Sequence, residues 1–393
     1  MPDYDYIIIG GGMTADAAVH GIHEVDKSAA IGLISSEPDA PYNRPPLTKA
    51  LWKGDPETTV WRHTEAEGVA LHLGRTATKI NPTARVVKDD QGEQHTYRKS
   101  LLLATGGAPR ALPFAAEGVM YYRTFRDYRA LREQANHDKR FAVLGGGFIG
   151  SEIAAALRMN GKEVVMIVPE KGIGAQVFPA DLAKFVTDYY REKGVDVREE
   201  TLSSSVERSG DGFTVGLESG DTLPADAVVA GLGIVPNVAL ATALGITTTD
   251  GIDVDERLRT RVDAVFAAGD VARFHNPALG IRLRVEHEDN ALTMGKAAGR
   301  SMAGDETPYT HLPFFYSDLF ELGYEAVGLL DSSLETFSDW KEPNREGVIY
   351  YLDKGRVRGV LLWNVWGKVD DARKVIAEPG PHSKSTLRGR ITG

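Results

Sequence analysis

Residues 6–15 read YIIIGGGMTA, and residues 141–150 read FAVLGGGFIG. In both stretches a short, continuously apolar run predicts a strand that is buried on both faces of a parallel sheet. A glycine cluster follows, and then the spacing of a packed helix, which we expect over 15–25 in the first copy and over 151 to about 160 in the second. Further apolar strands are expected at 31–34 and 163–168. The repeat predicts two βαβ units in one chain.

The first cluster, Gly10-x-Gly12-x-x-Ala15, has the order of a dinucleotide-binding fingerprint. Gly10 would allow the tight turn, Gly12 would let the backbone approach a pyrophosphate, and Ala15 is small enough for helix and strand to pack closely. Glu37 lies just beyond the second strand, where a carboxylate can accept hydrogen bonds from an adenosine ribose. Taken alone, this cluster is equally compatible with a glycine-rich turn.

The second cluster, Gly145-x-Gly147-x-x-Gly150, matches the fingerprint completely, and Glu170 follows at the end of the next strand. A carboxylate at that position binds a ribose 2′-hydroxyl and repels a 2′-phosphate. It therefore predicts NADH rather than NADPH, although the neighbouring Lys171 could tolerate the phosphate. Two fingerprints in one polypeptide predict a flavin and a nicotinamide, the pair that takes up a hydride and passes electrons on.

Composition excludes several classes of protein. The chain has 393 residues, no cysteine and a net charge of −10. Thiolate nucleophiles, cysteine-bound metals and dithiol relays are therefore excluded, and an acidic chain is a poor binder of nucleic acid. We expect no membrane span, since no apolar run is long enough, and no metal site. The acidic start, MPDYD, lacks the basic flank of a targeting segment, which predicts a cytoplasmic protein.

The C-terminal part has a different pattern from about residue 307 onward. Residues 348–352 and 357–363 flank a turn and predict an antiparallel hairpin, and the spacing over 369–376 predicts a short amphipathic helix. The last dozen residues are expected to form a loose tail. This part therefore predicts a small α+β domain.

Several motifs carry a resemblance to a known family: GGGMTA at 10–15, PYNRPPLTK at 41–49, ATGGAPR at 104–110, GGGFIGSE at 145–152 and AAGD at 267–270. Together they resemble the FAD-dependent pyridine nucleotide oxidoreductases of the glutathione-reductase fold. Within that family, FYSD at 315–318, GYEAVG at 323–328 and LWN at 362–364 are similar to the apoptosis-inducing factors and the related ferredoxin reductases.

The resemblance implies an α/β fold with two Rossmann-like dinucleotide-binding domains, for FAD and NAD, and a C-terminal α+β domain. The FAD-binding domain would comprise residues 1–114 and 247–309, and the NADH-binding domain residues 115–246. Residues 310–393 would form a C-terminal domain of the interface or dimerisation type.

The resemblance also assigns roles to single residues. Lys49 and Glu152 would form a catalytic ion pair beside flavin N5, where the hydride arrives. With the fingerprint residues included, the FAD-binding set is Gly10, Gly12, Thr14, Ala15, Glu37, Arg44, Lys49, Ala77, Thr105, Gly106, Arg123, Asp270, Glu286, His287 and Tyr316. The NAD-binding set is Gly147, Phe148, Ile149, Gly150, Glu170, Gly233, Glu286, Glu325 and Asn364.

Some of these residues have a simpler reading from the sequence alone. Asp270 is also placed to cap a helix, Arg44 and Arg123 could be solvated surface residues, and His287 could be an ordinary loop histidine. Tyr316 stands where the apoptosis-inducing factors have a tryptophan, and Gln176 replaces a lysine of that group. We therefore carry over no role in apoptosis.

The implied function is an FAD-dependent NADH oxidoreductase. Hydride would pass from NADH to flavin N5, and electrons would then pass to an acceptor other than a disulfide: a small ferredoxin-like protein, a quinone or oxygen. The alternative is a redox-sensing binding protein in which NADH and reduced flavin form a long-lived charge-transfer complex and the chain forms a homodimer.

Overall fold

Each of the two apolar runs ahead of a glycine cluster forms a strand of its own parallel sheet. The computed structural model describes residues 2–391, and these belong to two units, each assembled from separate stretches of chain. Unit 1 contains the described residues up to Arg44 together with Glu57–Ala108 and Val235–Pro313. Unit 2 contains Pro45–Pro56, Pro109–Ile234 and the described residues from Phe314 onward.

Unit 1 is built on a seven-stranded sheet. Its strands follow the order β3-β2-β1-β6-β5-β4, and β19 pairs with β6. β1, β2, β3, β6 and β19 run parallel, whereas β5 pairs antiparallel with both β6 and β4. The bounds are β1 Asp3–Ile9, β2 Ile31–Ser35, β3 Ala70–Leu73, β4 Ala77–Asn81, β5 Val86–Asp89, β6 Gln94–Leu103 and β19 Val265–Ala267.

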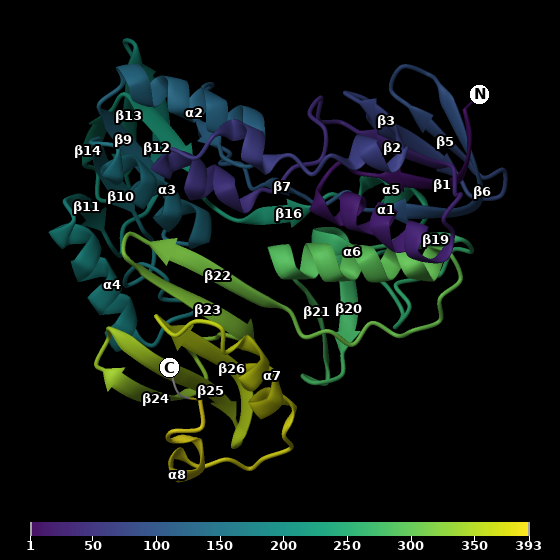
Figure 1. Ribbon diagram of the computed structural model, residues 1–393. Coiled ribbons are helices and arrows are strands. Elements are labelled where there is room, and N and C mark those ends of the chain that lie inside the picture. Colours follow the sequence, from purple (N-terminus) through teal and green to yellow (C-terminus); the bar gives the residue numbers. More distant parts are fainter. Residues whose placement is uncertain (1, 392–393) are drawn as a thin grey trace. The chain divides into compact units, whose positions relative to one another are not determined.

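Two helices of unit 1 lie side by side, α1 (Met13–Val25) and α6 (Glu288–Met302) (Figure 1). Glycines make this close packing feasible. A Cβ atom at Gly299 would lie 2.0 Å from the Ala18 carbonyl oxygen, and one at Gly295 would lie 2.4 Å from that of Thr14. Because α1 follows the first glycine cluster, this packing holds the start of α1 in place.

The rest of unit 1 consists of a small sheet and short helices. The sheet has the order β17-β18-β20-β21. The bounds are β17 Thr247–Thr248, β18 Gly251–Asp253, β20 Ala272–Asn276, β21 Ile281–Arg284, α5 Ala239–Ala243, and the 3-10 helices η3 Glu57–Val60, η4 Thr64–Glu67 and η5 Gly269–Val271. A separate two-stranded ribbon pairs β7 (Gly107–Pro109) with β16 (Ile234–Pro236).

Unit 2 contains three sheets. A parallel sheet has the order β11-β10-β9-β15-β8, and two antiparallel sheets have the orders β12-β13-β14 and β22-β23-β26-β25-β24. The bounds are β8 Met120–Tyr121, β9 Arg140–Leu144, β10 Glu163–Ile167, β11 Val195–Arg198, β12 Ser203–Ser209, β13 Gly212–Leu217, β14 Thr222–Ala225, β15 Ala227–Ala230, β22 Phe314–Leu319, β23 Leu322–Gly328, β24 Glu335–Glu342, β25 Glu346–Asp353 and β26 Arg356–Trp363.

Helices and 3-10 turns complete unit 2. Their bounds are η1 Pro45–Thr48, η2 Ala50–Lys53, α2 Phe125–His137, α3 Phe148–Met159, α4 Ala180–Glu192, α7 Val369–Ala377 and α8 Lys384–Leu387. Within the described range 2–391, no helix is both long enough and apolar enough to cross a bilayer.

The structure differs from the sequence-based expectation at two places. The helices after the glycine clusters begin earlier than expected, at Met13 and at Phe148, because the last fingerprint residues already form the first helical turn. The expectation of a loose tail is wrong for the last residues that the structure describes, 382–391. That part contains α8, buries Leu387 and Ile391, and donates the Gly389 N–H to the Asp339 carboxylate.

Candidate functional site

The first fingerprint forms a tight turn between β1 and α1 in unit 1. Gly10 has φ +128°, and a Cβ atom there would lie 2.1 Å from the Ala104 carbonyl oxygen, so only glycine fits. Gly12 stands at the N-cap of α1, and a Cβ atom there would meet nothing within 4 Å. The turn therefore leaves space in front of a helix N-terminus, where N–H groups face outward, and a pyrophosphate fits this arrangement.

The predicted acid after β2 is engaged with two neighbours. Tyr42 donates its hydroxyl to Glu37 over 2.6 Å, and Arg44 pairs with the same carboxylate. The Arg44 guanidinium also donates to the Tyr42 hydroxyl over 3.1 Å. The structure therefore brings together Glu37 and Arg44, two residues of the predicted FAD set.

Other residues of the predicted FAD set in unit 1 lie in strands or close after them. Thr105 donates its hydroxyl to the carbonyl of Asn237 over 2.7 Å, and the Asn237 N–H donates to the Gly106 carbonyl. Asp270 lies in η5, directly after β19. Ala77 is buried at the start of β4.

His287 is the N-cap residue of α6. Burial lowers the pKa of His287 to about 4, although the carboxylates of Asp270 and Asp289 oppose this shift. The neighbouring Glu286 pairs with Arg284 over 2.6 Å. His287 is therefore a neutral imidazole at neutral pH.

The second fingerprint repeats the first in unit 2, between β9 and α3. Gly145 has φ +105°, and Gly147 is the N-cap of α3, with nothing within 4 Å of a Cβ atom there. A Cβ atom at Gly150 would lie 2.2 Å from the Gly145 carbonyl oxygen, so the helix approaches the turn too closely for alanine. Phe148 and Ile149, in the first turn of α3, are 36% and 37% exposed.

The remaining residues of the predicted NAD set are spread over unit 2. Glu170 accepts a hydrogen bond from the Gln176 amide over 2.6 Å. Gly233 follows β15, with φ +79° and open space around a Cβ atom. Glu325 and Asn364 hold the C-terminal sheet together, since they accept from the N–H groups of Gly367 and Gly323.

A buried ion pair joins three segments of unit 2. Lys49 Nζ lies 2.7 Å from Glu152 Oε1, and their side chains are 12% and 5% exposed. Glu152 also accepts hydrogen bonds from the hydroxyls of Thr48 and Ser317, over 2.5 and 2.6 Å. Lys49 Nζ lies 5.2 Å from the centre of the Tyr316 ring, within the range of a cation–π contact. Lys49, Glu152 and Tyr316, all predicted from the sequence, therefore meet in one place.

Two buried tyrosines, Tyr324 and Tyr190, lie near this pair. Burial raises the pKa of Tyr324 and of Tyr190 well above the ordinary value, and the charge of Glu152 adds to both shifts. Both phenols therefore stay protonated. A buried pair of charges adds little to stability, because desolvation offsets the attraction. The arrangement instead fixes one ammonium group in a nearly dry environment.

Sequence reasoning missed the hydroxyl partners of Glu152. Thr48 and Ser317 lie 104 and 165 positions from it along the chain, and no spacing pattern connects them. The one signal in the sequence was their position, since Thr48 precedes Lys49 and Ser317 follows Tyr316. The remaining member of the predicted FAD set, Arg123, lies just before α2, and its N–H donates to the Asp127 carboxylate that also caps this helix.

Comparison with known proteins agrees with this geometry. The model of the pyridine nucleotide-disulphide oxidoreductase family matches residues 4–295. A second model, for the C-terminal domain of mitochondrion-associated apoptosis-inducing factor, matches residues 298–346 and 339–378. The expected α/β fold class and the expected family resemblance are therefore confirmed.

The named relatives include an apoptosis-inducing factor and a ferredoxin reductase component. Apoptosis-inducing factor 1, mitochondrial, of Dictyostelium discoideum is 39% identical in an alignment 417 residues long. The alignment covers 95% of this chain and 78% of the relative. The ferredoxin--NAD(+) reductase component of the anthranilate 1,2-dioxygenase system of Burkholderia cepacia is 34% identical over 382 residues, which cover 95% of this chain and 94% of the relative.

Among solved structures, the crystal structure of the covalent putidaredoxin reductase–putidaredoxin complex superimposes with a TM-score of 0.91 at 29% identity. The match covers 98% of this chain and 95% of that chain. From its two fingerprints, its sheets and these matches, the chain belongs to the pyridine nucleotide-disulphide oxidoreductase family and carries a C-terminal region of the apoptosis-inducing factor type.

Proposed function

We propose that the protein is a reductase that takes electrons from NADH onto FAD and passes them to a small ferredoxin-like redox protein. It is an oxidoreductase of the family named above, and relatives in this family use FAD and NAD(P)H. One observation carries the proposal. The chain contains two glycine fingerprints, each between a parallel strand and a helix N-terminus with open space in front of it.

We assign the FAD-binding site to unit 1. The open turn at Gly12 accepts the pyrophosphate, and the carboxylates of Glu37 and Asp270 are acceptors for hydroxyl groups of the cofactor. Neutral His287 at the start of α6 lies at a helix end that favours negative charge. We assign residues 1–114 and 247–309 to the FAD-binding domain, which contains most of unit 1 and, in addition, Pro45–Pro56 of unit 2.

We assign the NADH site to unit 2. The NADH-binding domain that we propose comprises residues 115–246, of which Val235 onward lies in unit 1, and the C-terminal domain comprises 310–393. The open turn at Gly147 accepts the second pyrophosphate, and Glu170 accepts the ribose hydroxyls. Gln176, which donates to Glu170, is neutral and would not attract a 2′-phosphate. These contacts favour NADH over NADPH.

We assign Lys49 and Glu152 to the reduction of the flavin. Bound FAD supplies the ring that takes up a hydride. Lys49, held by Glu152 in a nearly dry setting, supplies a fixed positive charge that favours the negative charge arriving with the hydride. Thr48 and Ser317 keep the Glu152 carboxylate in place through their hydroxyl groups.

The absence of cysteine and the named relatives support a small redox protein as the acceptor that we propose. The chain has no cysteine, so electrons cannot pass through a disulfide of its own. One relative is named as a ferredoxin--NAD(+) reductase component, and one solved structure holds putidaredoxin reductase with putidaredoxin. A small redox protein of the ferredoxin type is the corresponding partner for this chain.

The test is an anaerobic titration of the FAD-loaded protein with NADH, followed by addition of a [2Fe–2S] ferredoxin or of a quinone. We expect NADH to bleach the flavin absorbance and the ferredoxin to restore it with repeated turnover. A protein that purifies without flavin and cannot be reconstituted with it would contradict the proposal, as would a flavin that NADH does not reduce.

A second function is favoured by the match of residues 298–346 and 339–378 to the apoptosis-inducing factor C-terminal domain. In that case NADH and reduced flavin form a long-lived charge-transfer complex, and the chain forms a homodimer in response. The same experiment separates the two functions. A long-wavelength band that persists after air and acceptors are added, together with a shift to dimer in light scattering, supports the sensor and contradicts the reductase.

A further inference from the structure

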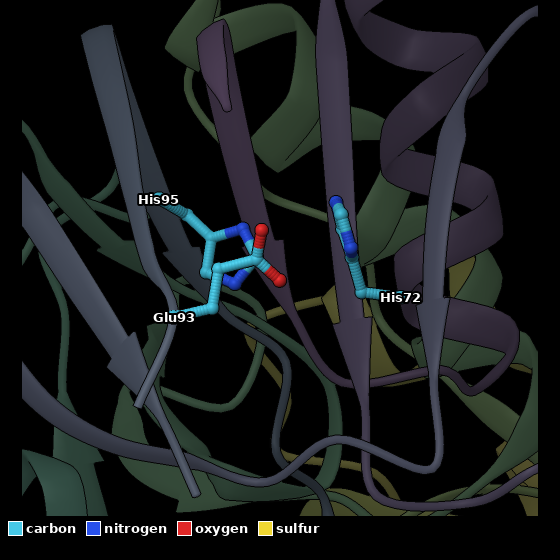
Figure 2. A group of neighbouring side chains, drawn as sticks. All are labelled: His72, Glu93 and His95. Atoms are coloured by element: carbon cyan, nitrogen blue, oxygen red, sulfur yellow. The ribbon is translucent and has the colours of Figure 1, made fainter. Parts of the chain in front are cut away.

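Two histidines and a glutamate meet in unit 1, apart from both fingerprints. His72 lies in β3, His95 lies in β6, and Glu93 lies in the turn between β5 and β6. One ligand atom from each side chain lies within 4.8 Å of the other two. Figure 2 shows Glu93 and His95 close together, with His72 facing them from β3, which β2 and β1 separate from β6 in the sheet.

His95 has a buried nitrogen that no protein group satisfies. The side chain is 0% exposed, and its Nε2 lies 3.3 Å from the Asp89 carboxylate. Facing a carboxylate, Nε2 carries the hydrogen, and Nδ1 of the neutral ring therefore presents its lone pair. This Nδ1 atom is buried and has no hydrogen-bond partner in the described structure. Leaving a buried acceptor unsatisfied costs about 1–3 kcal/mol of stability. A bound group that uses the Nδ1 lone pair would remove this cost.

Asp89 holds the His95 ring in this orientation. Its carboxylate accepts hydrogen bonds from the N–H groups of Gln91 and Glu93 and pairs with Arg75 over 2.9 Å. A histidine that donates one ring nitrogen to a fixed carboxylate and offers the other is the arrangement found around protein-bound metal ions. The same turn also brings Glu93 next to His95.

Tyr4 and Gly32 determine the position of the His72 ring. The hydroxyl of Tyr4 lies 2.7 Å from His72 Nε2, which leaves Nδ1 as the second ring nitrogen. Gly32 makes room for this contact, since a Cβ atom there would lie 2.6 Å from the Tyr4 ring. The rings of His72 and His95 are 4.5 Å apart between their centres. A glycine, a tyrosine and two strands therefore position the two imidazoles side by side.

The charges around the cluster suit a cation. Asp89 and Glu93 carry two negative charges, and the one neighbouring cation that contacts them, among the described residues, is Arg75. Arg75 lies 3.5 Å from Oε2 of Glu93, which leaves the other carboxylate oxygen for a ligand. The Glu93 side chain is 40% exposed, so one of the three candidate ligands is in contact with solvent.

We propose that His72, Glu93 and His95 bind a divalent transition-metal ion of the zinc type. Two imidazoles and one carboxylate form a ligand set that zinc accepts, with water in the fourth position. The ion would join β3 to the β5–β6 hairpin and would stabilise unit 1 without taking part in hydride transfer. The sequence-based expectation was that the chain has no metal site, and the proposal departs from it. The site differs from both nucleotide sites in its residues.

The experiment uses the oxidised, FAD-loaded, nucleotide-free protein after treatment with a chelator. Co²⁺ and Zn²⁺ are titrated separately, with calorimetry for stoichiometry, visible spectroscopy for the Co²⁺ bands, and thermal unfolding for stability. We expect one ion per chain, Co²⁺ bands at longer wavelength than the flavin absorbance, and a melting temperature that rises with the Zn²⁺ concentration. No binding at micromolar concentrations of either ion would overturn the proposal.

Variants locate the ion. His95→Gln should abolish binding, and Glu93→Gln should weaken it by about tenfold or more. Glu93 lies in a partly exposed turn, so its variant remains informative even if His95→Gln does not fold. The matched control is the double variant His20→Gln and His23→Gln, which removes two histidines of α1. Their Nδ1 atoms lie 3.7 and 3.5 Å from the carboxylate oxygens of Glu67 in η4. Binding that is lost in this control but retained in Glu93→Gln would refute the assignment.

Discussion

The two glycine fingerprints have almost the same sequence, yet the protein covers them differently. In unit 1, Met13 and Thr14 at the start of α1 are 5% and 7% exposed, because α6 packs against α1. In unit 2, Phe148 and Ile149 at the start of α3 are 36% and 37% exposed. Buried side chains in the first helical turn suit a cofactor that remains bound, and exposed ones suit a nucleotide that exchanges at every turnover. The same local motif can therefore serve two binding modes.

The acids of the two copies differ as well. Glu37 is held by the cation of Arg44 and by Tyr42, whereas Glu170 accepts from the neutral amide of Gln176. A carboxylate paired with arginine has its charge compensated within the protein. A carboxylate next to a neutral amide has no compensating cation, so its negative charge can repel the 2′-phosphate of NADPH. The second copy is therefore the one in which a single acid can decide specificity.

The largest expected effect comes from the turn of the first copy. Gly10→Ala adds a Cβ atom 2.1 Å from the Ala104 carbonyl oxygen at φ +128°, and we expect a loss of at least about 2 kcal/mol of stability together with loss of FAD. Flavin absorbance after gel filtration and thermal unfolding measure both effects.

The matched control is Gly12→Ala, whose Cβ atom would meet no protein atom within 4 Å. This variant should fold normally and bind FAD more weakly. In the second copy, Gly147→Ala should retain FAD and raise the KM for NADH. If Gly10→Ala purified with full flavin and wild-type stability, the assignment of the first turn would be wrong.

The next largest effect is expected at the ion pair of unit 2. Lys49→Ala leaves the Glu152 carboxylate with two hydroxyl donors and no cation, which we expect to cost about 3 kcal/mol of stability. Flavin reduction by NADH should be at least about tenfold slower, while FAD remains bound. Anaerobic stopped-flow spectroscopy measures the rate.

Lys53→Ala is the control for this prediction, since Lys53 pairs with Asp318 over 3.2 Å and its side chain is 49% exposed. It should change stability by less than about 1 kcal/mol and leave the rate unchanged. Equal reduction rates in wild type and Lys49→Ala would remove this pair from the chemistry.

A smaller effect is expected from His287 as the pH falls. The pKa of His287 is about 4 in the folded chain and about 6.5 in an unfolded one, so the unfolded state binds more protons between these values. Stability from this group is present above pH 6.5 and is lost as the pH falls toward 4, by about 3 kcal/mol at most. Thermal unfolding at pH 7 and pH 4.5 measures the loss, which should be smaller in His287→Asn. An identical acid sensitivity of the two proteins would contradict this explanation.

The smallest effect should come from the acid of the second copy. Glu170→Gln removes the charge that would repel a 2′-phosphate, so the preference for NADH over NADPH in kcat/KM should fall by about tenfold. Glu163→Gln, at the opposite end of β10 and paired with Arg140, is the control and should leave the preference unchanged. A wild-type protein that used both nucleotides equally well would overturn the role of Glu170.

Much of the fold could be predicted from the sequence because its signals are local. An apolar run followed by glycines predicts a strand and a tight turn, and Gly10 and Gly145 do have the positive φ that such turns require. The C-terminal hairpin was also predictable, since β25 and β26 flank a glycine turn. The described end of the chain was not, because the burial of Leu387 and Ile391 depends on contacts with distant strands.

The sequence by itself determined the α/β class, the two fingerprints and the absence of a thiol, since each depends on residue types at short spacing. The family resemblance implied the Lys49–Glu152 pair, but tertiary structure alone decided that Ser317 joins it and that two histidines and a glutamate meet in unit 1. Lys49, Glu152 and Ser317 come from three distant segments, and His72 meets Glu93 and His95 only because β3 and the β5–β6 hairpin belong to one folded unit. The physical reason is that a polar side chain brought out of water needs partners, and packing alone determines which ones are within reach.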